Sequence, residues 1–166
     1  MSLKSVDPFR NAGNQPHVVI PYSYADHEFA CRLAGALRRD GITQWIDEVD
    51  MSAGVFLVNR IYQAGRPVDD VIPVISAASV ASGWVQHELR TITARASNRR
   101  PVRVLPARVD GSALPGFLES LPCFDFHGSG WSRAYDDLMV AVHRRAQLQA
   151  ARSTPSLRLP PPARLT

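Results

Sequence analysis

The 166-residue sequence lacks the features that mark several large classes of protein. It has no apolar run approaching the roughly 18 residues that a membrane-spanning helix needs, and its first residues contain no apolar core of a signal peptide. Its two cysteines, Cys31 and Cys123, stand far apart without metal-ligand spacing, so we expect free thiols in a reducing compartment. These absences predict a cytoplasmic protein that does not insert into a membrane.

The sequence motifs of several well-known sites are also missing. There is no glycine-rich dinucleotide fingerprint, no P-loop and no Gly-x-Ser-x-Gly nucleophile elbow. The histidines and cysteines form no zinc pattern, which predicts that the protein has no metal site. A phospho-receiver domain would need clustered acids after its first strand and an aspartate closing its third, where this sequence has Pro21-Tyr22-Ser23 and Ser76. No resident cofactor is therefore predicted.

The formal net charge of +4 comes from the ends of the chain. Residues 16–143 contain 12 basic and 14 acidic residues, whereas five arginines and no acid follow from Arg144 onward. Because the central part is slightly acidic, we expect no specific nucleic-acid partner. We predict a disordered lead-in over residues 1–15, one domain over residues 16–146, and a flexible, basic, proline-rich tail over residues 147–166.

Short apolar, β-branched runs alternate with segments of helical spacing along this central part. The expected strands lie at residues 17–22, 43–46, 71–75, 103–107 and 123–126. The expected helices lie at residues 26–40, from 56 to before Pro67, from about 84 onward, and around 135–142. Strands that alternate with helices pair in parallel through right-handed crossovers. The pattern predicts a three-layer α/β sandwich with a five-stranded parallel sheet of order 2-1-3-4-5.

A doubly wound sheet of this order opens a crevice outside the carboxyl ends of its first and third strands. The loops that would border this crevice are residues 21–25, residues 76–83 and the acidic segment after the second strand.

Pro106 cannot donate a backbone hydrogen bond, so the fourth strand is expected to lie near an edge or to be irregular at its end.

Residues 71–89 are predicted to form a buried strand, a polar loop and a helix that begins with Trp84 and Glu88. Those two residues are four apart and share a helix face. The neighbouring face is expected to be buried, because it contains Val85, Leu89 and Ile92. An aromatic ring beside an acid at the crevice is consistent with the floor of a ligand site. The spacing equally allows Trp84 to cap the core and Glu88 to be a solvated helix residue.

Five segments occur in an order and spacing that are more specific than any one of them: VVIPYSYADHEFACRLAGALRRDGITQWID, SAGVF, VIPVISAASVASGWVQHEL, VRVLPARVD and LPGF. Together they resemble the successive boxes of a Toll/interleukin receptor (TIR) domain of the bacterial kind, over about residues 17–143. The resemblance implies the flavodoxin-like form of the sheet described above. Pro21 departs from the pattern, because a small residue is usual at that position.

The resemblance also implies a site. Members of the family either hydrolyse or cyclise NAD+ with one glutamate of the third helix, or act as non-enzymatic adaptors by homotypic assembly. Glu88 falls on that glutamate, and Trp84 precedes it by four residues. The substrate-binding positions implied by the family boxes are Tyr22, Ser23 and Tyr24 in the loop that lines the nucleotide, and Asp47 to Phe56 in the mobile loop after the second strand.

A single acid fits cleavage of the nicotinamide–ribose bond. Nicotinamide leaves from a cationic pyridinium as a neutral amide, so no second carboxyl group is needed to protonate it, unlike in sugar hydrolysis. One carboxylate can stabilise the oxocarbenium-like charge. Trp84 is predicted to stack on the pyridinium or the adenine, with the tyrosines and Phe56 as the opposite wall.

The resemblance therefore implies an NAD+ glycohydrolase or ADP-ribosyl cyclase with NAD+ as substrate rather than cofactor. Its setting would be bacterial antiphage defence or immune signalling, with self-association through TIR–TIR contacts and a sensor or effector protein as a further partner. The first alternative is a non-enzymatic TIR adaptor. A more distant alternative is an enzyme similar to nucleoside deoxyribosyltransferases, which use related glycosidic chemistry on a similar sheet.

Overall fold

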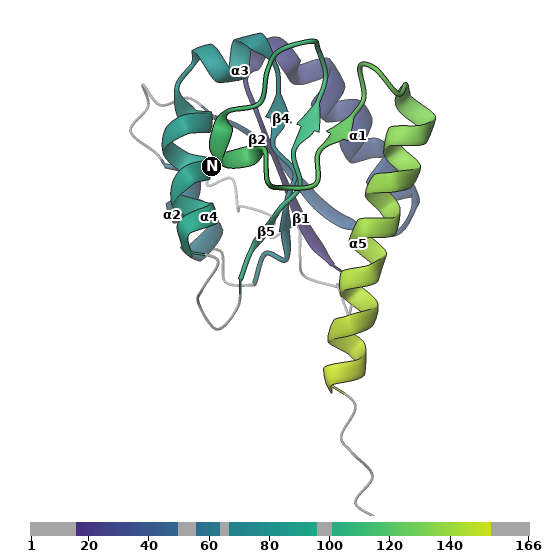
Figure 1. Cartoon of the computed structure of the whole chain (residues 1–166). Coiled ribbons are helices and arrows are strands. Elements are labelled where there is room, and N and C mark those ends of the chain that lie inside the picture. The colour runs from purple at the N-terminus through teal and green to yellow at the C-terminus, as the bar shows by residue number, and fades with distance from the viewer. Residues whose placement is uncertain (1–15, 50–55, 64–66, 96–100, 154–166) are drawn as a thin grey trace, which may run out of the picture.

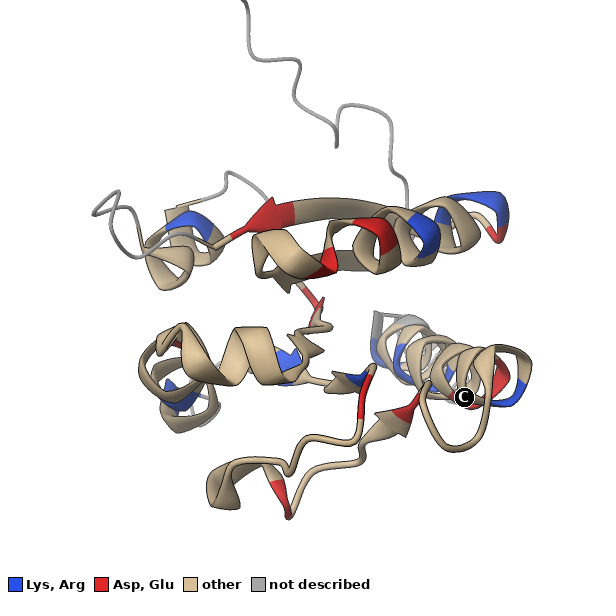
Figure 2. Cartoon of the chain, turned by 90° about the horizontal axis from the view of Figure 1, so that it is seen from above, with Lys and Arg blue, Asp and Glu red and all other residues tan. Residues whose placement is uncertain are grey.

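A computed structural model describes residues 16–49, 56–63, 67–95 and 101–153 of the chain. The expected lead-in, residues 1–15, and the last part of the expected tail lie outside these described residues. In Figure 1, helices α2 (Leu57–Gln63) and α4 (Arg90–Ala94) cover one face of the central strands, and α1 (His27–Arg39) and α5 (Trp131–Ser153) cover the other. Seen from above in Figure 2, helices stand on both sides of the strands, so the predicted α/β arrangement with a parallel sheet is confirmed.

The strands pair in parallel as two sheets rather than one. The first has the order β2-β1-β3-β5 and the second the order β4-β6-β7. The described residues form the strands β1 (His17–Tyr22), β2 (Thr43–Glu48), β3 (Asp70–Val71), β4 (Val74–Ile75), β5 (Arg103–Val104), β6 (Ala107–Arg108) and β7 (Phe124–Asp125). The predicted single sheet of five strands therefore does not form. Each expected strand nevertheless lies beside the neighbour that the predicted order 2-1-3-4-5 gives it.

Two prolines explain the division into two sheets. Pro73 separates β3 from β4 and Pro106 separates β5 from β6, and neither residue has an N–H to donate to its neighbour. Backbone hydrogen bonds resume directly after each proline, and the carbonyl of Pro73 accepts from the N–H of Ala107 at 2.9 Å. Both expectations for the fourth strand are met: β5, before Pro106, is the edge strand of the first sheet, and the strand is interrupted at Pro106, after which β6 lies between two partners.

Two buried clusters hold the layers together. Neighbouring side chains of a strand point to opposite faces, and β1 accordingly places Val18 and Ile20 in one cluster and Val19 in the other. The first cluster packs α1 and α5 on the strands. The second packs α2, α4 and a π-helix, Val85–Leu89, on the opposite face. Because β1 is apolar at successive positions, both of its faces are buried, as the sequence predicts for a central parallel strand.

Helix α1 lies within the predicted segment, residues 26–40, and is one residue shorter at each end. The side chain just before it makes a contact other than a helix cap. Asp26 stands at the N-cap position without a side-chain hydrogen bond to the helix. Its carboxylate instead accepts a hydrogen bond from the hydroxyl of Ser76 at 2.5 Å, which links the end of β1 to the end of β4. The helix is followed by Gly41, whose φ of 77° is a left-handed conformation that glycine adopts without strain.

The segment from Ser76 to Ala94 corrects two predictions. The expected polar loop contains a short helix, α3 (Ala77–Ala81), whose N-terminus is capped by the Ser76 hydroxyl accepting from the N–H of Ser79. The expected α-helix through Trp84 and Glu88 begins as the π-helix and only then continues as α4. A π-helix has more residues per turn than an α-helix. Side chains that would lie on different faces of an α-helix therefore come to lie on one face of a π-helix. Both Trp84 and Glu88 are buried, together with Val85, Leu89 and Ile92.

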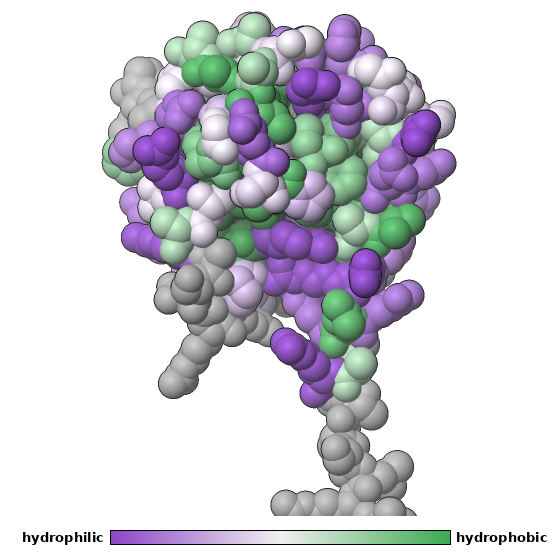
Figure 3. Space-filling model, in the orientation of Figure 1, coloured by the Kyte–Doolittle hydropathy of each residue, from purple (hydrophilic) through white to green (hydrophobic). Residues whose placement is uncertain are grey.

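The last helix is longer than predicted. Helix α5 runs to Ser153, so the expected boundary between domain and flexible tail at residues 146 and 147 is wrong for residues 147–153. Figure 3 shows its lower end projecting from the body with mostly hydrophilic residues. None of the described helices is both long enough and apolar enough to span a bilayer.

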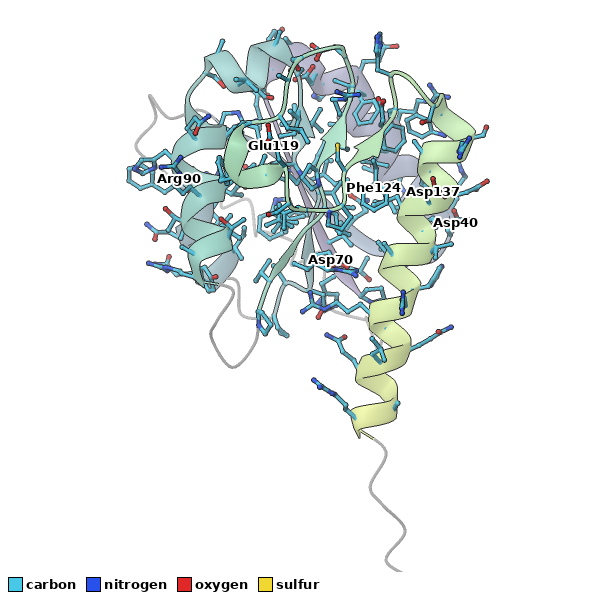
Figure 4. All side chains as sticks on the ribbon, viewed as in Figure 1. Asp40, Asp70, Arg90, Glu119, Phe124 and Asp137 are labelled. Carbon is cyan, nitrogen blue, oxygen red and sulfur yellow. The ribbon has the colours of Figure 1, made fainter. Side chains whose placement is uncertain are left out.

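An arginine pair fastens α5 to the amino-terminal edge of the sheet. Asp70, labelled at the lower part of the strands in Figure 4, is fully buried and accepts two hydrogen bonds from Arg103, at 2.9 and 3.1 Å. Arg145 of α5 donates to the carbonyl of Asp69 at 2.6 Å and lies 3.3 Å from the Asp70 carboxylate. One turn later, Gln149 donates to the Asp69 side chain at 3.2 Å. The main contacts of α5 at this edge therefore precede residue 147.

We expect a chain that ends at Gln147 to lose only about 1 kcal/mol of unfolding free energy relative to one that ends at Ser153. The shorter chain keeps Arg145 and loses the exposed contact of Gln149. For a domain of this size the melting temperature should fall by about 2–4 °C. Thermal unfolding of the two chains measures the difference, and a fall of 10 °C or more would contradict the view that residues 148–153 add little to the fold.

Candidate functional site

The carboxylate of Glu88 lies inside the protein. The residue is 1% exposed, and its Oε2 accepts a hydrogen bond from the backbone N–H of Val58 at 3.0 Å. That N–H belongs to the first turn of α2, where backbone donors have no partner within the helix. Its Oε1 lies 3.9 Å from Nδ1 of His87. The alternative of a solvated helix residue is wrong for Glu88, which instead contacts the start of a neighbouring helix.

A second buried carboxylate is fixed by an arginine. Asp47 lies near the end of β2, and its two oxygens accept hydrogen bonds from Nε and Nη2 of Arg60 at 2.6 and 2.7 Å. Burial raises the pKa of Asp47 above its usual value and the negative charge of Glu88 raises it further, while the Arg60 guanidinium acts in the opposite direction. The two carboxylates thus lie close enough to interact, and α2 contacts both of them through Val58 and Arg60.

Trp84 lies in the core rather than at an open surface. Its side chain is 0% exposed, and its Nε1 donates to the hydroxyl of Ser23 at 2.8 Å. The Ser23 hydroxyl also lies 3.2 Å from the hydroxyl of Ser82. The indole therefore joins the loop after β1 to the segment that follows α3. A ring without exposed surface cannot stack on a ligand in this conformation, so in this structure Trp84 packs in the core and contacts Ser23.

The remaining predicted residues lie in three different settings. Tyr22 is buried in the cluster on the opposite face of the sheet from Glu88, and its hydroxyl lies 2.9 Å from Nδ1 of His27. Tyr24 begins a short 3-10 turn, Tyr24–Asp26, and is 80% exposed. Phe56 is 38% exposed, and its ring centroid lies 6.0 Å from that of His87. The predicted loop between Asp47 and Phe56 falls largely on residues 50–55, which lie outside the described residues.

Three residues that contact the predicted site residues were not identified from the sequence. Arg60 pairs with Asp47 across 13 positions, and no periodic pattern signals such a contact. Ser82 falls in the loop over residues 76–83 that is expected to border the crevice, but no sequence pattern indicates that its hydroxyl meets that of Ser23. Neighbours on an α-helix point about 100° apart, so sequence adjacency gives no reason to pair His87 with Glu88, yet the two side chains come within 3.9 Å in the π-helix. A glycine before the helix, Gly83 with φ 83°, was the available signal of irregular backbone.

The arrangement brings together two acids, an arginine and a histidine from three elements: the end of β2, helix α2 and the π-helix that follows α3. Oε1 of Glu88 lies near Nδ1 of His87, whereas the carboxylate of Asp47 is paired with Arg60. Among the residues that the structure describes, no three His, Cys, Asp or Glu side chains are placed to hold a metal ion. The chemistry that this set of side chains can supply is electrostatic stabilisation of a cation by a carboxylate.

Comparison with protein families gives one finding. The family model described as TIR domain matches residues 18–139. A search of curated proteins gives no match. The matched residues make up well over half of the 166-residue chain and contain β1 apart from His17, β2 through β7 and the start of α5. With its parallel strands, its flanking helices and this match, the chain belongs to the TIR domain family.

Proposed function

We propose that the protein is an NAD+ glycohydrolase or ADP-ribosyl cyclase that cleaves the bond between nicotinamide and ribose, with Glu88 as the catalytic carboxylate. The observation that supports this proposal is the buried carboxylate of Glu88 beside the end of β2, within a family that includes NAD+-cleaving enzymes. Antiphage defence or immune signalling is the proposed setting. A sensor or effector protein is the proposed additional partner.

The reaction requires one group that stabilises a positive charge on the ribose. The C–N bond breaks with its electron pair going to the pyridinium nitrogen, so nicotinamide departs neutral and C1′ of the ribose becomes cationic. The negative charge of Glu88 stabilises that cation, and this stabilisation is greater in a site from which water is excluded. Water adding at C1′ and losing a proton gives ADP-ribose, whereas attack by an adenine nitrogen gives a cyclic product.

The two carboxylates of the site suit different tasks. Asp47 forms two short hydrogen bonds to Arg60, which match its charge and fix its orientation. Glu88 accepts a backbone hydrogen bond from Val58, and its other oxygen lies 3.9 Å from His87. Within the part of the chain that the structure describes, a cation therefore matches the charge of Asp47 more fully than that of Glu88. We assign Asp47 and Arg60 to holding α2 in place.

Access to Glu88 requires a movement. At 1% exposure the carboxylate cannot meet a nucleotide until the first turn of α2 moves away from it, which breaks the hydrogen bond from Val58. A hydrogen bond to a charged group contributes about 1.5–3 kcal/mol, so the open form is the minor one in the isolated chain. Any partner that binds the open form better shifts the population toward it. Self-association through TIR–TIR contacts is the proposed source of that shift.

Specific activity is therefore expected to rise with protein concentration. At a protein concentration where light scattering detects monomer alone, NAD+ consumption per molecule should be low, and it should rise at least about tenfold when assembly is detected, because 1.4 kcal/mol of differential binding changes a population tenfold. Separation of the products by chromatography identifies nicotinamide and the ribosyl product. A specific activity that stays flat across dilution in a demonstrably monomeric sample would contradict the proposed coupling.

The second candidate function is a non-enzymatic adaptor that acts by homotypic assembly. The observation that favours it is the contact between Glu88 and Val58, since a glutamate that caps a helix has a structural reason to be present. An adaptor would consume no NAD+ even when assembled. The same concentration series therefore distinguishes the two functions.

A further inference from the structure

Four side chains outside the Glu88 site form a chain of contacts that ends at an exposed thiol. The hydroxyl of Tyr22 donates toward Oε2 of Glu48 at 3.5 Å and lies 2.9 Å from Nδ1 of His27. The other ring nitrogen of His27, Nε2, lies 3.4 Å from Sγ of Cys31. His27 and Cys31 are one turn apart on α1, and both are exposed. A nucleophile, a base and a group that orients the base therefore stand in sequence.

The distances in this chain allow an arrangement of protons in which His27 is a base. Burial, and then the nearby charge of Glu48, raises the pKa of the Tyr22 phenol above its usual value, so the phenol is protonated at neutral pH. When that proton is donated to Glu48, the Tyr22 oxygen is left to accept from Nδ1–H of His27. The opposite nitrogen, Nε2, then has no proton and faces the Cys31 thiol. This tautomer can take the thiol proton.

We propose that Cys31 is a nucleophilic thiol that forms mixed disulfides with low-molecular-weight disulfides, with His27 as its general base. Nε2 of His27 takes the proton of Cys31, and the thiolate attacks one sulfur of the incoming disulfide. The S–S bond of the reagent breaks as the new bond to Cys31 forms. The departing thiolate takes the proton from the imidazolium. The Cys31 sulfur is oxidised, and one sulfur of the reagent is reduced to a thiol.

The second cysteine of the chain offers a matched comparison. Cys123 is half-buried, and burial is the largest cause of a pKa raised above the ordinary thiol value. It has no histidine among the groups that affect it, which are Arg108 and Asp125. The proposal therefore concerns Cys31 alone. It does not depend on whether the protein consumes NAD+.

The test uses the full-length protein and oxidised glutathione at neutral pH, with the modified peptides quantified by mass spectrometry over time. A thiol is only a few per cent ionised at pH 7, so full proton transfer to a base can raise its reaction rate by at most about 30-fold. We expect His27→Gln to slow modification of Cys31 by about tenfold. The rate at Cys123 should be unchanged in the same sample.

Two controls keep the outcome interpretable. Because His27 is exposed, His27→Gln is expected to keep the melting temperature of the parent protein, which thermal unfolding verifies. Cys31→Ser should abolish the modification that is assigned to Cys31 and leave that at Cys123. If His27→Gln reacts at Cys31 within twofold of the parent rate, the contact between the two side chains is only structural and the proposal is overturned.

Discussion

Replacing Glu88 by glutamine is expected to lower NAD+ consumption by on the order of 10² to 10³-fold, the scale for losing one preorganised electrostatic group. The substitution keeps the volume of the side chain and removes the charge that would face the developing cation. It also keeps an amide oxygen that can accept from the N–H of Val58, so the contact with α2 is retained. The measurement is the rate of nicotinamide release under conditions where the protein assembles.

The glutamine variant separates catalysis from capping because the two roles need different properties of the side chain. A catalytic role needs the charge, whereas a cap needs only an acceptor, so melting temperature and self-association should barely change. Glu119→Gln is the matched control, since Glu119 is an exposed acid elsewhere on the surface, labelled in Figure 4, and its loss should leave the rate intact. Parent-level activity in the assembled Glu88→Gln protein would remove Glu88 from the reaction.

Replacing Trp84 by alanine is expected to cost about 3–5 kcal/mol of unfolding free energy, the largest stability effect of the substitutions considered. The indole has no exposed surface, and its removal leaves a cavity between the π-helix and the strands. It also removes the donor to Ser23. The melting temperature should fall by on the order of 10 °C, measured by thermal unfolding at fixed protein concentration.

The phenylalanine substitution at the same position distinguishes a core role from a ligand-stacking role. Trp84→Phe keeps an aromatic ring and loses part of the volume together with the N–H that reaches Ser23. In the core role the variant has intermediate stability, and any rise in KM for NAD+ follows the loss of folded protein. A Trp84→Ala protein that melts like the parent but fails to bind NAD+ would instead place the ring at the ligand.

Much of the fold follows from local sequence. The continuous apolar run of β1 predicts a strand buried on both faces, and the helical spacing of Phe29, Leu33 and Leu37 predicts α1 within one residue of its observed ends. Pro106 was recognised as a point where a strand becomes irregular. Pro73 was not, because the apolar residues on both sides of it fit a single strand. The sheet divides where a proline lacks the N–H that a neighbouring strand would accept. Which strand lies beside each proline is known only from the strand pairing in the structure.

The site was harder to predict because two of its features are not periodic. Spacing places Trp84 and Glu88 on one face of an α-helix and predicts one buried face beside it, whereas both residues are buried, Trp84 just before the π-helix and Glu88 within it. The ion pair between Asp47 and Arg60 joins the end of a strand to the next helix, and its geometry depends on tertiary packing. The family resemblance identified Glu88 as the residue of interest, whereas its burial and its contact with Val58 required three-dimensional information.

The direction of α5 has a consequence for how the protein can be attached to something else. The helix begins after β7, at the carboxyl-terminal edge of the strands, and runs back past Asp70 to Ser153 at the far edge (Figure 1). Glu88 and Asp47 lie toward the first edge. A dye, a bead or a solid support coupled through the end of α5 would therefore be held away from these carboxylates. Immobilisation at that end should orient the molecules with the candidate site facing solution.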